Sequence, residues 1–268
     1  MTPAARSSRM VLLIVGALLL AACTARSSAT TPTTAASPSP SFVAPSSASP
    51  TPVPSPTPIP PSPSPSPAVV RTHFAGRISA IPAAIASQMR GTTWKPGCPV
   101  PISGLRLLEF NYVGFDDVVK RGELVVNASV AEDVLWVFQQ LFDARFPLRK
   151  VGLARKYVAG KEDPNDRHDV TASFNCRPAI TPSGPTSSFS QHAYGLAVDV
   201  NPMQNPEVGP NGQVRNNFAR PYRDRSLDRP GMIQPGDVVV RSFAAIGWKW
   251  GGDWSSFKDY MHFSLSGT

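Results

Sequence analysis

The chain has 268 residues, 41 % of them apolar, and 26 basic residues against 18 acidic ones give a formal net charge of +8. This length suffices for one substantial domain or two small ones, and the apolar share is ordinary for a globular protein. No cluster of Lys or Arg interleaved with aromatic residues occurs, so the sequence does not support nucleic-acid binding. The moderate positive charge permits contact with anionic polymers or lipid headgroups without requiring it.

Residues 1–22 have the layout of a secretory signal peptide: two arginines, then an apolar run from Met10 to Leu20, then small residues. The run falls short of the roughly 20 apolar residues that span a bilayer, although an uncleaved anchor helix is the alternative. Leu20-Ala21-Ala22-Cys23 resembles a bacterial lipobox, in which cleavage precedes the cysteine and the cysteine becomes lipidated. We therefore expect an extracytoplasmic protein of the bacterial envelope, anchored to the membrane by a lipid at Cys23.

Residues 23–68 are rich in Ser, Thr and Pro, and 14 of the 30 prolines lie between Pro32 and Pro67. A segment with so little to bury cannot offset its ordering entropy, which predicts a disordered linker of polyproline character. Such a linker would act as a spacer between the membrane anchor and a folded domain. That domain is expected to span residues 69–268.

Three cysteines are present, and lipidation of Cys23 would leave Cys98 and Cys176 as an even pair in an oxidising compartment. A disulfide between them is therefore expected. Two buried free thiols are the alternative, because sequence alone cannot bring two Cα atoms within bonding distance.

The first part of the domain combines helices with strands. A short helix is expected from Ile78 to Met89, and strands over residues 105–113 and 124–128. Ser129 to Glu132 fits a capping box that opens a helix with one apolar face, which ends before Pro147. Residues 157–169 are charged and rich in turn-forming residues, and predict a loop at the edge of a site.

The second part alternates between short strands and loops. Leu196, Val198 and Val200 alternate with Asp199, which predicts a strand with Asp199 on its polar face. Because His192 and Asp199 are an odd number of residues apart, a turn near Gly195 must intervene if both are to face one ion. Expected next are a surface excursion, a helix capped by Asp237, an aromatic turn and a final strand, over residues 201–229, 237–246, 247–254 and 261–265.

These elements predict the α+β class: a small antiparallel sheet flanked by helices, with a site in a cleft on the sheet. Four histidines are present, and His73 beside the linker and His168 in a charged loop are most simply solvated. His192 and His262 instead lie in apolar, Gly-rich or aromatic stretches near carboxylates. A single histidine of this kind is more often a core residue, but two that each pair with a carboxylate favour a metal site.

A catalytic zinc site takes three protein ligands and keeps a fourth position for water. His192, Asp199 and His262 would provide two nitrogens and one oxygen, a set that suits one zinc ion better than magnesium or calcium. Asp259, three residues before His262, is then expected to accept the proton of the activated water as general base.

The pattern Ser-x-His-x-x-Gly-x-Ala-x-Asp over residues 190–199, followed by Gly-Trp-x-Trp-Gly-Gly and Asp-x-x-His-Phe, resembles a known family. It is similar to the zinc D,D-carboxypeptidase and L-alanyl-D-glutamate peptidase family of bacterial cell-wall enzymes and phage endolysins. The resemblance covers about residues 105–266 and implies the same three zinc ligands and Asp259 as the base.

The resemblance also implies roles for residues around the metal. Arg177 would be catalytic and substrate-binding, its guanidinium steadying a substrate carboxylate or the developing oxyanion. Ser190 would contact substrate or support a ligand, and Trp250 would form a wall of the cleft. Ser264 stands where relatives often carry Glu. This difference affects a residue that would support the metal ligands, but it changes none of the ligands themselves.

The function expected from the sequence is a monomeric zinc metallopeptidase that hydrolyses peptidoglycan stem peptides as a D-alanyl-D-alanine carboxypeptidase. Cleavage between L-alanine and D-glutamate by the same site is the first alternative. A non-catalytic zinc-containing module that binds the cell wall is the second.

Overall fold

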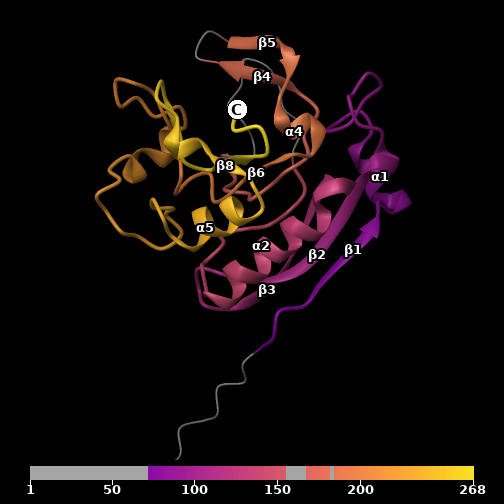
Figure 1. Ribbon diagram of the computed structural model, residues 1–268, viewed down its shortest axis with the longest axis horizontal. Coiled ribbons are helices and arrows are strands. Elements are labelled where there is room, and N and C mark those ends of the chain that lie inside the picture. The colour runs from indigo at the N-terminus through magenta and orange to yellow at the C-terminus, as the bar shows by residue number, and fades with distance from the viewer. Residues whose placement is uncertain (1–71, 155–166, 182–183) are drawn as a thin grey trace, which may run out of the picture. The chain divides into compact units, whose positions relative to one another are not determined.

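The computed structural model describes residues 72–154, 167–181 and 184–268 (Figure 1). All of them fall in one unit that spans residues 66–268. The predicted signal peptide, the lipidation site Cys23 and the linker lie outside the described residues, as does most of the predicted loop at 157–169. Within the described ranges, no helix has the length and apolarity needed to cross a membrane.

The first half of the domain is an antiparallel sheet in the order β1–β2–β3, covered by a helix (Figure 1). The long hairpin of β2 and β3 pairs Leu105 with Asn127 at one end and Val113 with Val119 at the other. The bounds of these elements are β1 (Gly76–Ala80), α1 (Ala83–Met89), β2 (Leu105–Val113), β3 (Val119–Asn127) and α2 (Ala131–Asp143).

Both faces of the β2–β3 hairpin are buried, each in a different cluster. Leu108, Phe110 and Leu124 face α2, where the rings of Phe110 and Phe138 stack at 4.5 Å between centroids. Leu107 and Val125, on the opposite face, belong to a second cluster with Phe174, Cys176 and Ala193. Because side chains alternate along a strand, the hairpin joins the helical layer to the segments that precede and carry His192.

The second half builds a smaller antiparallel sheet in the order β6–β10–β8, with α5 packed between it and α2. Phe263 of β10 stacks on Phe243 of α5 at 4.2 Å, and both side chains are fully buried. The bounds are α4 (Gln191–Tyr194), β6 (Ala197–Asp199), α5 (Val238–Ala245), β8 (Lys249–Trp250) and β10 (His262–Ser264).

Two short ribbons flank this sheet. One is the hairpin of β4 (Pro178–Thr181) and β5 (Gly184–Phe189), and the other pairs β7 (Glu207–Val208) with β9 (Lys258–Asp259). Short 3₁₀ helices complete the described fold: η1 (Ile102–Gly104), η2 (Ala128–Val130), η3 (Asn217–Tyr222) and η4 (Gly251–Asp253).

Cys98 and Cys176 form a disulfide, as predicted, with 78 residues of sequence separation and Cα atoms 6.0 Å apart. The bond joins the segment after α1 to the strand-like segment that leads into the hairpin β4–β5. The backbone N–H of Cys176 also donates to the carbonyl of Thr93. The disulfide therefore fixes the approach to Arg177.

Two local predictions are wrong. Residues 76–80 form strand β1 rather than the start of a helix, because they pair with β2. The capping box at Ser129 does not form: the side chain of Asn127 caps η2, which runs directly into α2.

The segment 201–229 is more than a surface excursion. Four of its polar residues are buried, and the amide of Asn205 donates to the carbonyls of Val200, Asn201 and Gly231. The buried residues are Asn201, Gln204, Asn205 and Asn216.

Candidate metal centre

The segment 190–199 turns sharply to bring His192 and Asp199 to one side. Ser190 begins the four-residue helix α4, and its hydroxyl accepts a hydrogen bond from the backbone N–H of His192 at 3.3 Å. Gly195 ends α4 with a φ of +68°, in the left-handed region that favours glycine. A Cβ atom at Gly195 would also lie 2.5 Å from the backbone nitrogen of Asn127. Glycine is therefore required here for both its conformation and its size.

The strand pairing then places His262 beside this segment. In the antiparallel pair of β6 and β10, His262 lies directly opposite Asp199. Opposed residues in an antiparallel pair have side chains on the same face, so both point toward the end of α4. The two halves of the sequence pattern meet, as the prediction required.

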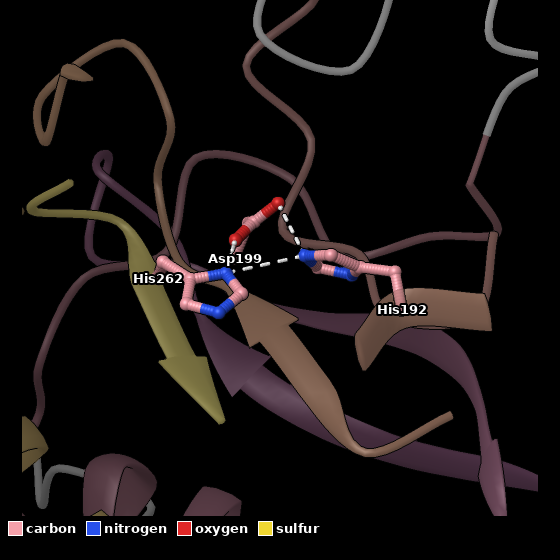
Figure 2. Close-up of side chains that lie close together, drawn as sticks. All are labelled: His192, Asp199 and His262. Carbon is pink, nitrogen blue, oxygen red and sulfur yellow. Dashed lines mark hydrogen bonds and ion pairs between the residues drawn. The ribbon is translucent and has the colours of Figure 1, made fainter. Parts of the chain in front are cut away.

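Figure 2 shows the side chains of His192, Asp199 and His262 pointing toward one another. The Nε2 atom of His192 lies 3.1 Å from Oδ2 of Asp199, and the Nδ1 atom of His262 lies 3.1 Å from Oδ1. The two nitrogens are 3.3 Å apart. Ligand atoms bound at about 2.0–2.1 Å to one tetrahedral zinc ion are separated by about 3.3–3.4 Å, so this spacing fits the ion.

The hydrogen bonds around His192 leave the correct nitrogen free to bind a metal. Its Nδ1 lies 2.8 Å from the carbonyl oxygen of Ser173, and a carbonyl oxygen only accepts, so Nδ1 carries the proton. When the ring binds a metal, Nε2 is therefore the nitrogen that would offer its lone pair, on the side of Asp199 and His262. A backbone partner of this kind is typical of metal-binding histidines.

Asp199 is held in its charged form. Burial alone would raise the pKa of Asp199, but the charges and hydrogen bonds of His192 and His262 hold it well below its ordinary value. Two nitrogens and one carboxylate, gathered at a buried point, are a group of donors that could hold a metal ion.

Asp259 lies near this group, on the ribbon of β7 and β9, where it is paired with Glu207. Its Oδ1 atom is buried and has no hydrogen-bond partner among the described residues, although the residue as a whole is only partly buried. Burial, together with the negative charges of Asp199 and Glu207, raises the pKa of Asp259 to about 8. A nearby cation would lower this pKa and favour the carboxylate.

These residues line a cavity of about 800 Å³. His192, Asp199, Asp259 and His262 all contribute to its wall. Half-buried Arg177 and the capping residue Ser190 also line it, and they are joined by a hydrogen bond from the backbone N–H of Ser190 to the carbonyl of Arg177.

Trp250 does not line this cavity, which corrects the prediction that it forms a wall of the cleft. Its side chain is 3 % exposed, packs beside Phe263, and donates through Nε1 to the carbonyl of Tyr260. Trp254 lines the cavity instead, with its ring 5.4 Å from that of His262.

Sequence reasoning missed an ion pair in the cavity wall. Arg215 lies 3.0 Å from Glu207, and both residues line the cavity together with exposed Phe218. All three come from the segment 201–229, which was predicted to be a surface excursion because it is rich in turn-forming residues. The one local signal was Glu207 itself, the single acidic residue between Asp199 and Asp224.

The family model described as D-alanyl-D-alanine carboxypeptidase matches residues 183–265. The match supports the predicted resemblance to this family over these residues. The matched region of this carboxypeptidase family contains His192, Asp199, Asp259 and His262, whereas Arg177 and the disulfide lie before it. The family supports a peptidase of the cell-wall carboxypeptidase type. No solved structure matches the chain significantly.

Proposed function

We propose that the protein is a zinc metallopeptidase that hydrolyses peptidoglycan stem peptides, as a D-alanyl-D-alanine carboxypeptidase. One observation carries this proposal: the donor atoms of His192, Asp199 and His262 gather in the wall of a cavity that also contains Asp259. Buried polar atoms are normally hydrogen-bonded, so a purely structural role would not explain a buried carboxylate oxygen without a partner beside three side chains that can bind a metal.

His192, Asp199 and His262 would hold the zinc ion through Nε2, a carboxylate oxygen and Nδ1. The fit rests on the 3.3 Å spacing of the two nitrogens and on the proton fixed at Nδ1 of His192 by Ser173. When bound, zinc supplies a Lewis acid and lowers the pKa of its water to about 7.

Asp259 is the proposed general base. Its carboxylate would accept a proton from the attacking water and return it to the nitrogen of the departing amine. Partial neutralisation by the metal would bring the pKa of Asp259 down toward the range in which a base is effective at neutral pH.

Arg177 and Ser190 have supporting roles in this proposal. The guanidinium of Arg177 offers a planar set of donors suited to a substrate carboxylate or to the oxyanion formed during hydrolysis. Ser190 contributes by capping the helix that carries His192, in addition to facing the cavity. The disulfide beside Arg177 restricts the backbone from which its side chain extends.

The same proposal includes an extracytoplasmic location, with the mature chain attached to the membrane by a lipid at Cys23 and acting as a monomer. The linker at 23–68 would let the domain reach wall peptides at a distance from the membrane. Replacing Cys23 by Ser should abolish fatty-acid labelling and release the protein from the membrane fraction. Continued labelling of the Cys23→Ser variant would contradict the anchor.

Defined stem peptides test the reaction itself. Wild-type protein is incubated with zinc and a pentapeptide ending in D-alanyl-D-alanine, and the products are weighed. Release of the terminal D-alanine supports the carboxypeptidase, whereas release of an L-alanine fragment supports the endopeptidase. Binding of zinc and wall without cleavage would support a non-catalytic module.

The base is tested by Asp259→Asn, with Asp253→Asn as the matched control. Asp253 is exposed and does not line the cavity, so its substitution should leave hydrolysis unchanged. Asp259→Asn should retain zinc and lose at least about a hundredfold in kcat, the usual contribution of general base catalysis. Equal activity of the two variants would exclude Asp259 as the base.

A further inference from the structure

A second cavity of about 830 Å³ adjoins the candidate active site. Four residues line both cavities, so the two cavities share a wall. The shared residues are Glu207, Arg215, Asn217 and Phe257. Neither the family match nor the proposed catalytic residues assign any role to this second cavity.

The 3₁₀ helix η3 presents a row of hydrogen-bond donors to this cavity. Side chains three residues apart lie above one another in a 3₁₀ helix. Asn217, Arg220 and Arg223 have this spacing, with Arg223 directly after the last residue of η3, and all three line the second cavity. The local backbone therefore gathers one amide and two guanidinium groups on one side.

The acidic residues of this cavity are already engaged by protein groups. Glu207 pairs with Arg215 at 3.0 Å, and Asp224 accepts hydrogen bonds from the N–H and the hydroxyl of Ser226. Within the described part of the chain, Arg220 and Arg223 form no ion pair and no side-chain hydrogen bond. Both residues are exposed, so their charge is available to a ligand.

We propose that this second cavity binds a carboxylate of the acidic peptide substrate, at a residue away from the cleaved bond. This inference rests on the proposed function and names the part of the substrate that the site recognises. Guanidinium groups form paired, charge-assisted hydrogen bonds with carboxylates, and a cavity next to the catalytic residues receives the same peptide chain. A bounded cavity suits a peptide better than a long anionic polymer, which needs an extended basic stripe.

The test compares two stem pentapeptides that differ only in the α-carboxyl group of D-glutamate, which is free in one and amidated in the other. Arg220→Gln/Arg223→Gln is measured beside wild type. Arg90→Gln/Arg121→Gln removes two exposed charges that line neither cavity and serves as the matched control. Both kcat/KM and the Kd of each peptide are determined, the latter by calorimetry on Asp259→Asn protein.

Wild type and the control should prefer the free carboxylate by about tenfold, as expected for a hydrogen-bonded charge pair, and the preference should fall with added salt. Arg220→Gln/Arg223→Gln should lose the preference while cleaving the amidated peptide at the wild-type rate. Cleavage of both peptides at equal rates by wild type, or an unchanged preference in the variant, overturns the inference but leaves the peptidase intact.

Binding separates this inference from the proposed function. If the peptides bind with the expected preference but are not cleaved, the peptidase is refuted and the anion site is supported. If neither peptide binds wild type, the inference fails. It also fails if an oligomer of glycerol phosphate displaces the bound peptide and depends on Arg220 and Arg223 for tight binding, because the site then belongs to that ligand.

Discussion

The raised pKa of Asp259 predicts that the metal-free protein loses stability as the pH increases. In the folded state Asp259 keeps its proton up to about pH 8, whereas an aspartate in the unfolded chain loses it near pH 4. The folded state therefore binds more protons between these two values, and the free energy of unfolding falls as pH rises. Each unit of pKa difference corresponds to about 1.4 kcal/mol, which makes the loss between pH 5 and pH 8 on the order of 3 kcal/mol.

Urea denaturation of metal-free wild type and Asp259→Asn at pH 5 and pH 8 measures this effect. The two proteins should differ little at pH 5, and Asp259→Asn should be the more stable at pH 8, because it carries no charge to bury. Added zinc should reduce the difference, since a nearby cation favours the carboxylate. Equal pH dependence of the two proteins without metal would refute the electrostatic argument.

Two further predictions concern the supports of the site. Replacing Cys98 and Cys176 together by Ser should lower the free energy of unfolding by about 4 kcal/mol, the loop-closure value for the 78-residue separation. A loss below about 1 kcal/mol, measured by urea denaturation, would contradict this prediction. Gly195→Ala should destabilise by more than about 1–2 kcal/mol, the cost of the left-handed backbone alone, because its Cβ would also meet the backbone nitrogen of Asn127 at 2.5 Å. Gly247→Ala, which shares the positive φ but has nothing within 4 Å of its Cβ, is the control; an equal loss in both variants, or unchanged zinc affinity in Gly195→Ala, would refute the role of close packing.

Local patterns predicted the elements whose structure is decided locally. The strand over 105–113 has the predicted bounds, and the apolar face expected for the helix of residues 131–143 is buried. Asp237 caps α5 as expected, with its carboxylate accepting from the N–H of Val240. Strand β1 was missed because it depends on pairing with β2, about 30 residues away in the sequence.

The candidate site divides in the same way. His192, Asp199 and His262 were predictable because each lies within a few residues of another site residue, His192 with Asp199 and His262 with Asp259. The turn at Gly195 followed from the odd spacing of His192 and Asp199. Glu207 and Arg215 were not predictable, because only the nonlocal pairing of β7 with β9 brings them to the cavity. Trp250 and Trp254 could not be told apart, since both lie in one aromatic turn and only the packing sends Trp250 into the core.

Zinc titration of the metal-free protein tests the central claim most directly. Calorimetry should show one zinc ion bound per chain by wild type and by His168→Ala, whose exposed histidine lies away from the cavity. Asp199→Asn and His262→Ala should lose this binding while remaining folded by circular dichroism. Absence of zinc binding by wild type, or equal affinity in folded Asp199→Asn and His262→Ala, would contradict the assignment of these residues as a metal centre.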